Sequence, residues 1–136
     1  MRSIFLMLLC LLTLSSCSLD DDAPQYRLEL LPIESVELPS EFQIGNTYSI
    51  TLRYIKPTTC HIYDGIYFEK DLNIRTFAVR SAVLLGGNCL STDNEVVEQT
   101  FDFYVTSNGS YIFKFWHGTD ENGEEIYLEY EIPVTD

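Results

Sequence analysis

Four cysteines and two histidines are the residues of this chain that are best suited to lipid attachment, disulfide formation, nucleophilic attack or metal binding. The most specific arrangement is Leu14-Ser15-Ser16-Cys17, which closes an apolar run that begins at Ile4. With Arg2 ahead of the run and small residues before Cys17, the segment has the parts of a secretory signal. The run is too short to span a bilayer, which takes about 20 residues. We therefore expect cleavage directly before Cys17.

The position of Cys17 at this cleavage point predicts that lipid is attached to its sulfur. Several acyl chains, each contributing about 0.8 kcal/mol per buried CH₂, anchor a protein stably where one chain does not. The alternative is an ordinary signal peptide in which the cysteine is coincidental. Asp20-Asp21-Asp22 follow the cysteine closely. They resemble the acidic export signal of Bacteroidota surface lipoproteins, which implies an outer-membrane lipoprotein exposed at the surface; a solvated acidic linker is the alternative.

The remaining chain has the size of one domain. We expect a signal peptide over residues 1–16, a lipidated cysteine and acidic linker over 17–24, and one β-domain over 25–136. The formal net charge of −13 excludes binding to a nucleic acid backbone or to an anionic membrane surface. It suits a basic partner or divalent cations, or it serves solubility alone. The expected partners are the membrane, through the lipid anchor, and an unidentified protein; no cofactor is expected.

Cys60 and Cys89 remain once Cys10 leaves with the signal and Cys17 carries lipid. In an oxidising compartment they are the only possible disulfide pair. Closing a loop of this length stabilises the fold by roughly 3–4 kcal/mol. The alternative is a catalytic thiol at Cys60 beside His61. Neighbouring residues on a strand point to opposite faces, which disfavours that pairing.

Alternation of apolar and polar residues predicts strands along the whole domain. Turn residues separate them at Lys56-Pro57, Gly86-Gly87-Asn88, Ser107-Asn108-Gly109 and Asn122-Gly123. The expected strands are Gln25–Leu31, Ser35–Leu38, Thr47–Ile55, His61–Glu69, Ile74–Leu85, Val96–Val105, Tyr111–His117 and Ile126–Val134. Seven or eight short strands predict an all-β fold, an antiparallel β-sandwich of immunoglobulin-like type. A small antiparallel barrel is the competing architecture.

Trp116 and Tyr127 are candidate binding residues. Alternation places Tyr111, Phe113 and Phe115 on one face of their strand and Trp116 on the other. Exposed aromatic rings anchor protein partners and stack on sugar rings. The alternative is packing of these rings inside a second layer.

Metal-binding and catalytic patterns are weak. Asp120, Asn122 and Glu124 are similar to the start of a calcium loop, but the required spacing and helical flanks are absent. An acidic hairpin tip is the favoured interpretation, and weak calcium binding is the alternative. His61 and His117 lack the clustering that zinc needs. No Gly-x-Ser-x-Gly element supports a catalytic triad, so no catalytic residue is predicted.

Two resemblances extend these expectations. Pro57-Thr58-Thr59-Cys60, Phe113–Trp116 and Tyr127–Tyr130 resemble the shared pattern of a family of short Bacteroidota lipoproteins, which implies no activity. Pro57-Thr58-Thr59 also resembles part of the Asn-Pro-Thr-Thr-Gly loop of chagasin-type inhibitors of papain-like cysteine proteases, which are immunoglobulin-like domains. The flanking Asn and Gly of that loop are missing here. The Arg-Pro-Trp element of the inhibitors is also missing, with Ile132-Pro133-Val134 in its place.

The sequence therefore predicts a membrane-anchored, non-enzymatic binding domain. Protease inhibition through Pro57, Thr58 and Thr59 is one alternative. Glycan or calcium binding through Trp116, Tyr127 and the 120–125 turn is another.

Overall fold

The computed structural model describes residues 23–136, and this part of the chain is built from strands without a helix. The predicted signal peptide, Cys17 and the three aspartates lie outside the described residues. The strands are β1 (Tyr26–Leu31), β2 (Ile33–Glu37), β3 (Phe42–Gln43), β4 (Thr47–Thr58), β5 (His61–Asp71), β6 (Ile74–Leu84), β7 (Ser91–Tyr104), β8 (Tyr111–Thr119), β9 (Glu125–Ile132) and β10 (Val134–Thr135). In residues 23–136 no helix has the length and hydropathy needed to cross a membrane.

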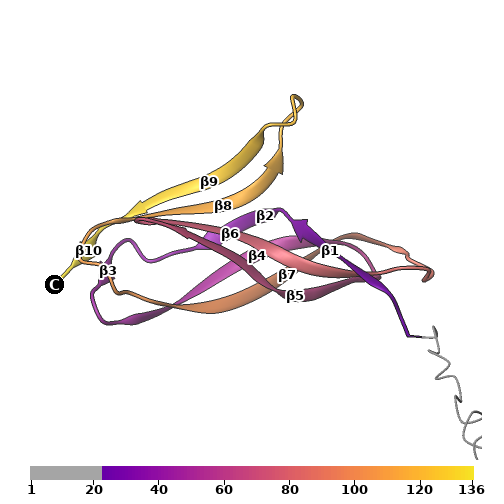
Figure 1. Cartoon of the computed structure of the whole chain (residues 1–136), viewed down its shortest axis with the longest axis horizontal. Helices are drawn as coiled ribbons and strands as arrows, with labels where there is room; N and C mark the ends of the chain where they lie inside the picture. The colour runs from indigo at the N-terminus through magenta and orange to yellow at the C-terminus, as the bar shows by residue number, and fades with distance from the viewer. Residues whose placement is uncertain (1–22) are drawn as a thin grey trace, which may run out of the picture.

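The strands form two principal sheets that pack face to face (Figure 1). The five-stranded sheet contains β5, β6, β1, β8 and β9, and the three-stranded sheet has the order β2-β4-β7. β3 and β10 add a short parallel pair, and β6 pairs with β8 in parallel; the other pairings are antiparallel. The predicted all-β antiparallel sandwich is thus confirmed, whereas its immunoglobulin-like type stays a prediction.

Residues 23–136 contain ten strands, and eight of them correspond to the strands expected from the sequence. The two additional strands, β3 and β10, have only two residues each. The chain changes sheets at Pro32, so that β1 joins the five-stranded sheet and β2 the three-stranded one. Proline has no backbone N–H and interrupts pairing in a strand, so it suits this crossing point.

The core between the sheets is largely aromatic. Phe103 on β7 lies 4.9 Å from Phe113 and 5.2 Å from Tyr111, both on β8, between ring centroids. Phe77 on β6 lies 5.1 Å from Phe101 on β7. These contacts join the two sheets, as expected for inward residues of alternating strands. The prediction that Tyr111, Phe113 and Phe115 share one face of their strand is confirmed, and this face points into the core, since all three are fully buried.

Tyr111 also fixes the entry into β8. Its hydroxyl oxygen accepts hydrogen bonds from the backbone N–H groups of Thr106 (3.1 Å) and Ser107 (2.9 Å). A tyrosine that binds backbone a few residues upstream is a known corner device of β-sandwiches. Burial alone would raise the pKa of this phenol, but the hydrogen bonds from Thr106 and Ser107 outweigh burial and lower it.

The predicted turn at Lys56-Pro57 is wrong. β4 continues through Pro57 to Thr58, and the connection to β5 consists of Thr59 and Cys60 alone. The register between β4 and β7 shifts between Lys56 and Thr58. A proline is tolerated there because such an irregular position does not require its missing N–H for the ladder.

β1 presents the apolar side chains of Tyr26, Leu28 and Leu30 to solvent, whereas Leu31 at its end is buried. Leu28 is 69 % exposed, and Tyr26 and Leu30 lie on the same outer face of the five-stranded sheet. Glu29 points to the other face, where its carboxylate lies 3.1 Å from Nε2 of the buried His61. The alternation predicted from the sequence is present, but here Glu29 points inward to His61 while Leu28 and Leu30 point outward.

Candidate ligand-binding cleft

A cleft opens on the outer face of the five-stranded sheet where β6 changes partners. β6 pairs with β8 from Ile74 to Phe77 and with β1 from Val79 onward. Ala78 lies between these two pairings. After Phe115, β8 leaves the sheet together with β9, and the hairpin rises away from the sandwich (Figure 1). The separation of β8 from β6 leaves open space above Ala78.

Three neighbouring residues set the course of the departing hairpin. The register between β8 and β9 shifts between Trp116 and Gly118, which marks a bulge. Gly118 has φ +105°, and a Cβ atom there would lie 3.6 Å from Cγ of Pro32. His117 Nδ1 donates a hydrogen bond of 2.6 Å to the carbonyl oxygen of Ile33. The bulge bends β8, while His117 fastens it to the start of β2.

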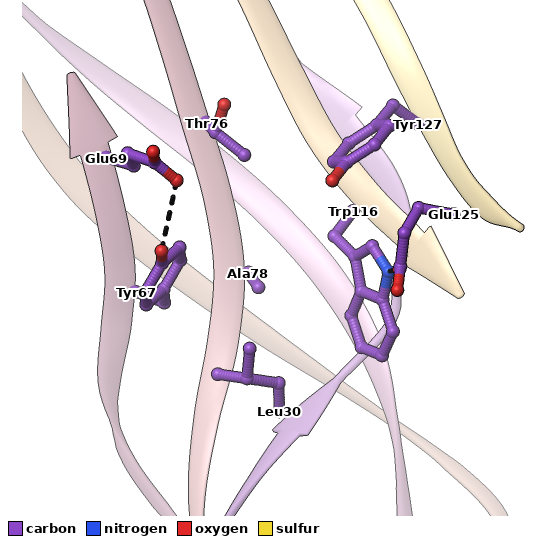
Figure 2. A pocket seen from close by; sticks show the side chains of 8 residues that line it. All are labelled: Leu30, Tyr67, Glu69, Thr76, Ala78, Trp116, Glu125 and Tyr127. Carbon is purple, nitrogen blue, oxygen red and sulfur yellow. Dashed lines mark hydrogen bonds between the residues drawn. The ribbon is translucent and has the colours of Figure 1, made fainter. Parts of the chain in front are cut away.

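The cleft has a volume of about 310 Å³. Figure 2 shows Tyr67 and Glu69 of β5 on one side and Trp116, Glu125 and Tyr127 of the β8–β9 hairpin on the other. Between them lie Leu30, Thr76 and Ala78, and no further aromatic ring is among the lining residues, so that the two aromatic sides face a common space. We call this opening the aromatic cleft. Its lining residues are Leu30, Tyr67, Glu69, Thr76, Ala78, Trp116, Glu125 and Tyr127.

Polar contacts orient the rings of the aromatic cleft. The Tyr67 hydroxyl donates to the Glu69 carboxylate over 3.1 Å, and this hydrogen bond raises the pKa of Tyr67 above its ordinary value. The indole N–H of Trp116 donates to the carboxylate of Glu125. On the hairpin, Nζ of Lys114 lies 4.4 Å from the centre of the Tyr127 ring. Each aromatic ring therefore has a partner that holds it in place.

This set of groups is suited to binding a ligand that has both flat apolar faces and hydroxyl groups. The rings supply stacking surfaces, and each carboxylate retains free lone pairs after accepting one hydrogen bond. Ligand sites are typically concave and apolar with a few polar groups that fix orientation, and this volume lies at the lower end of their range.

Trp116 and Tyr127, both predicted from the sequence, are brought together by the structure. They are directly opposite each other on β8 and β9, and both are half-buried on the outer face. Glu125 also lines the cleft and belongs to the 120–125 turn that the sequence hypothesis named with them, whereas Tyr67 and Glu69 were not predicted. The Asn122-Gly123 hairpin signal could have placed Glu125 near Trp116. Tyr67 and Glu69 reach the cleft only through the non-local neighbourhood of β5, β6 and β8.

The acidic tip of the β8–β9 hairpin is organised by its own backbone. Oδ1 of Asp120 accepts hydrogen bonds from the N–H groups of Asn122 (2.8 Å) and Glu124 (2.9 Å). This is the usual behaviour of an aspartate in a turn. Across residues 23–136 no cluster of three histidine, cysteine, aspartate or glutamate residues could hold a metal ion.

Pro57, Thr58 and Thr59 do not line the aromatic cleft. The Thr58 hydroxyl lies 2.8 Å from Nδ1 of His61 and also accepts from the N–H of Cys60. The Thr59 hydroxyl accepts from the N–H of Leu90. The predicted disulfide between Cys60 and Cys89 is present, with a Cα–Cα distance of 5.3 Å. Both threonines are thus engaged within the protein.

Comparison of the chain with protein-family models, with curated proteins and with solved structures finds no match.

Proposed function

We propose that this chain is a lipid-anchored, non-enzymatic binding domain that holds a glycan in the aromatic cleft. The observation that carries the proposal is that Trp116 and Tyr127 face Tyr67 across a floor formed by Leu30, Thr76 and Ala78. Sugar rings have an apolar face that stacks on aromatic rings, and their hydroxyl groups donate to carboxylates. Glu69 and Glu125 supply these acceptors.

The negative charge of the cleft restricts the class of glycan that we expect it to bind. Two carboxylates line the cleft, and the whole chain has a net charge of −13. An acidic sugar would meet like charge at both places, and like charges in a partly desolvated site repel. The proposed ligand is therefore a neutral oligosaccharide.

Removal of one aromatic ring tests this proposal. Tyr127→Ala is expected to weaken binding of neutral oligosaccharides about ten-fold, because about 1.4 kcal/mol of stacking is lost. Trp116 is the only tryptophan, so its fluorescence reports on the cleft directly. The full-length protein, kept in a zwitterionic detergent without a sugar headgroup, is titrated with soluble gluco-, manno- and xylo-oligosaccharides.

Tyr104→Ala is the matched control, because Tyr104 is a 58 % exposed aromatic residue on β7 outside the cleft. Its affinity should equal that of the wild type. Equal affinities of the Tyr127→Ala variant and the wild type would contradict the proposal. So would a titration in which every neutral sugar leaves the Trp116 fluorescence unchanged.

The lipid anchor is part of the proposal and has its own test. Cys17→Ser is expected to abolish lipid attachment, because the acylated sulfur is lost. The protein should then either move from the membrane fraction to the soluble fraction or keep its signal peptide uncleaved. Cys10→Ser is the control, since Cys10 lies within the apolar run of the signal. Fractionation followed by immunoblotting measures the effect. Unchanged membrane association of a Cys17→Ser variant that is still cleaved to the mature length would refute lipidation at this residue.

The cleft is a better basis for a function than the Pro57–Cys60 connection. The two threonine hydroxyls in that connection bind groups within the protein, and Cys60 is tied to Cys89. A loop that enters a protease cleft needs side chains that are free to make new contacts. No contact in this connection favours the inhibitor hypothesis over glycan binding.

A further inference from the structure

A second apolar opening lies between the edges of the two sheets. β5 is an edge strand of the five-stranded sheet, and β7 is an edge strand of the three-stranded sheet. Between them is a slot of about 230 Å³. We call it the edge slot; its lining residues are Ile66, Phe68, Phe77, Phe101, Asp102 and Phe103. None of them belongs to the aromatic cleft.

Phe68 leaves the edge slot incompletely covered. Its ring packs 5.5 Å from that of the buried Phe77, yet Phe68 is 51 % exposed. Phe77 in turn lies 5.1 Å from Phe101 on the opposite sheet. The aromatic core therefore continues to the surface at this edge, and further apolar side chains could be buried against it.

The backbone beside this slot is available for pairing. Within the part of the chain that the structure describes, β5 pairs only with β6. Its first half is irregular, with a register shift between Tyr63 and Ile66 and Gly65 at φ +105°. A bulge of this kind discourages pairing at an edge. From Ile66 to Asp71 the register is regular, and alternate residues of such a strand direct their N–H and C=O groups away from the existing partner.

We propose that the free edge of β5 from Ile66 to Asp71 binds an extended, basic peptide segment of a partner protein, which adds a strand to the five-stranded sheet. Main-chain hydrogen bonds supply the affinity in strand addition, and alternate side chains enter adjoining pockets. Here the apolar side chains of the added strand would enter the edge slot. This stretch of β5 includes Tyr67 and Glu69, which also line the aromatic cleft, whereas the edge slot and the aromatic cleft share no lining residue.

The sign of the partner's charge follows from the residues of the slot and of the β5 edge. Asp102 lines the slot, and along the β5 edge the acidic Glu69 and Asp71 outnumber the one basic residue, Lys70. A second copy of this chain would bring another charge of −13 to the same edge. Like charges directly opposite each other on neighbouring strands are destabilising. A basic segment of another protein meets opposite charge and is therefore the favoured occupant.

Hydrogen exchange with a defined peptide tests the proposal. The probe is a synthetic ten-residue peptide of alternating valine and lysine, added to the full-length protein in zwitterionic detergent. Exchange of the backbone amides in residues 66–71 is expected to slow about ten-fold at saturating peptide. The free edge of β9 should be unchanged. Phe68→Ser should weaken binding of the peptide about ten-fold, whereas Tyr104→Ser should leave it unchanged.

Two further peptides test the charge and the strand pairing separately. A peptide of alternating valine and glutamate should not protect residues 66–71, and neither should the basic peptide with proline at its centre. Equal protection by the acidic peptide would overturn the charge argument. Slower amide exchange at other residues, or no change anywhere, would overturn the proposed site. Slower exchange of residues 66–71 that increases with protein concentration in the absence of peptide would show that a second copy of the chain occupies the edge. Tyr127→Ala should bind the basic peptide normally, which separates this test from that of the glycan site.

Discussion

Phe113→Ala is expected to lower the free energy of unfolding by about 3–5 kcal/mol. The Phe113 ring is fully buried and lies 4.9 Å from Phe103, 5.1 Å from Phe77 and 5.6 Å from Phe42. These neighbours belong to three other strands, so Phe113 lies where both sheets and the β3 segment meet. Removing it loses the transfer free energy of the ring and leaves a cavity that rigid strands fill poorly.

Urea unfolding with the disulfide intact measures this change. A loss of this size is a large share of the 5–15 kcal/mol that is typical of a domain. Tyr104→Ala, at an exposed position, should cost no more than about 0.5 kcal/mol. A loss below about 1.5 kcal/mol for Phe113→Ala would mean that the aromatic cluster collapses easily, which would contradict the close packing of the two sheets.

Strand positions and faces were predictable where a strand has one buried side. On β4, Ile50, Leu52 and Tyr54 alternate with polar residues and are all buried. On β8 the same reasoning separated Phe113 and Phe115 from Trp116. The reason is the two-residue period of a strand, which assigns side chains to faces without knowledge of the partner strands.

Which face points inward was not predictable for β1. Its period separates Leu28 and Leu30 from Glu29, but hydrophobicity alone would bury the leucines. The structure leaves Leu28 exposed because β1 pairs with β6 in a register that places Glu29 opposite the buried Ser81 and near His61. Register depends on residues far away in the sequence, so a local pattern does not contain it.

The residues of the candidate site were likewise predictable only where local turn signals bring their strands together. Trp116 and Tyr127 belong to one hairpin, whose Asn122-Gly123 turn predicts that its two strands are neighbours. Tyr67 enters the cleft because β6 pairs with β5 along one edge and with β8 along the other. The second pairing is parallel and joins segments separated by a complete strand, and turn signals do not reveal such a pairing.

The double substitution Cys60→Ala/Cys89→Ser is expected to lower the free energy of unfolding by about 3–4 kcal/mol. The disulfide closes a loop that contains the whole β5–β6 hairpin. Backbone hydrogen bonds hold the same region together, from Thr59 to Leu90 (2.9 Å) and from Leu84 to Cys60 (3.0 Å). The folded state should therefore persist without the disulfide, and the loss should come mainly from the greater freedom of the unfolded chain.

The dependence of unfolding on urea distinguishes this origin from damage to the folded state. A chain without the cross-link exposes more surface when it unfolds, so the slope m should rise as the stability falls. Wild-type protein unfolded in reductant should match the double variant within about 1 kcal/mol, since both lack the same constraint. A comparable loss of stability with an unchanged m would instead locate the effect in the folded protein, where Cys60 is buried and packs near Gly87. A loss below about 1 kcal/mol would contradict the loop-closure argument itself.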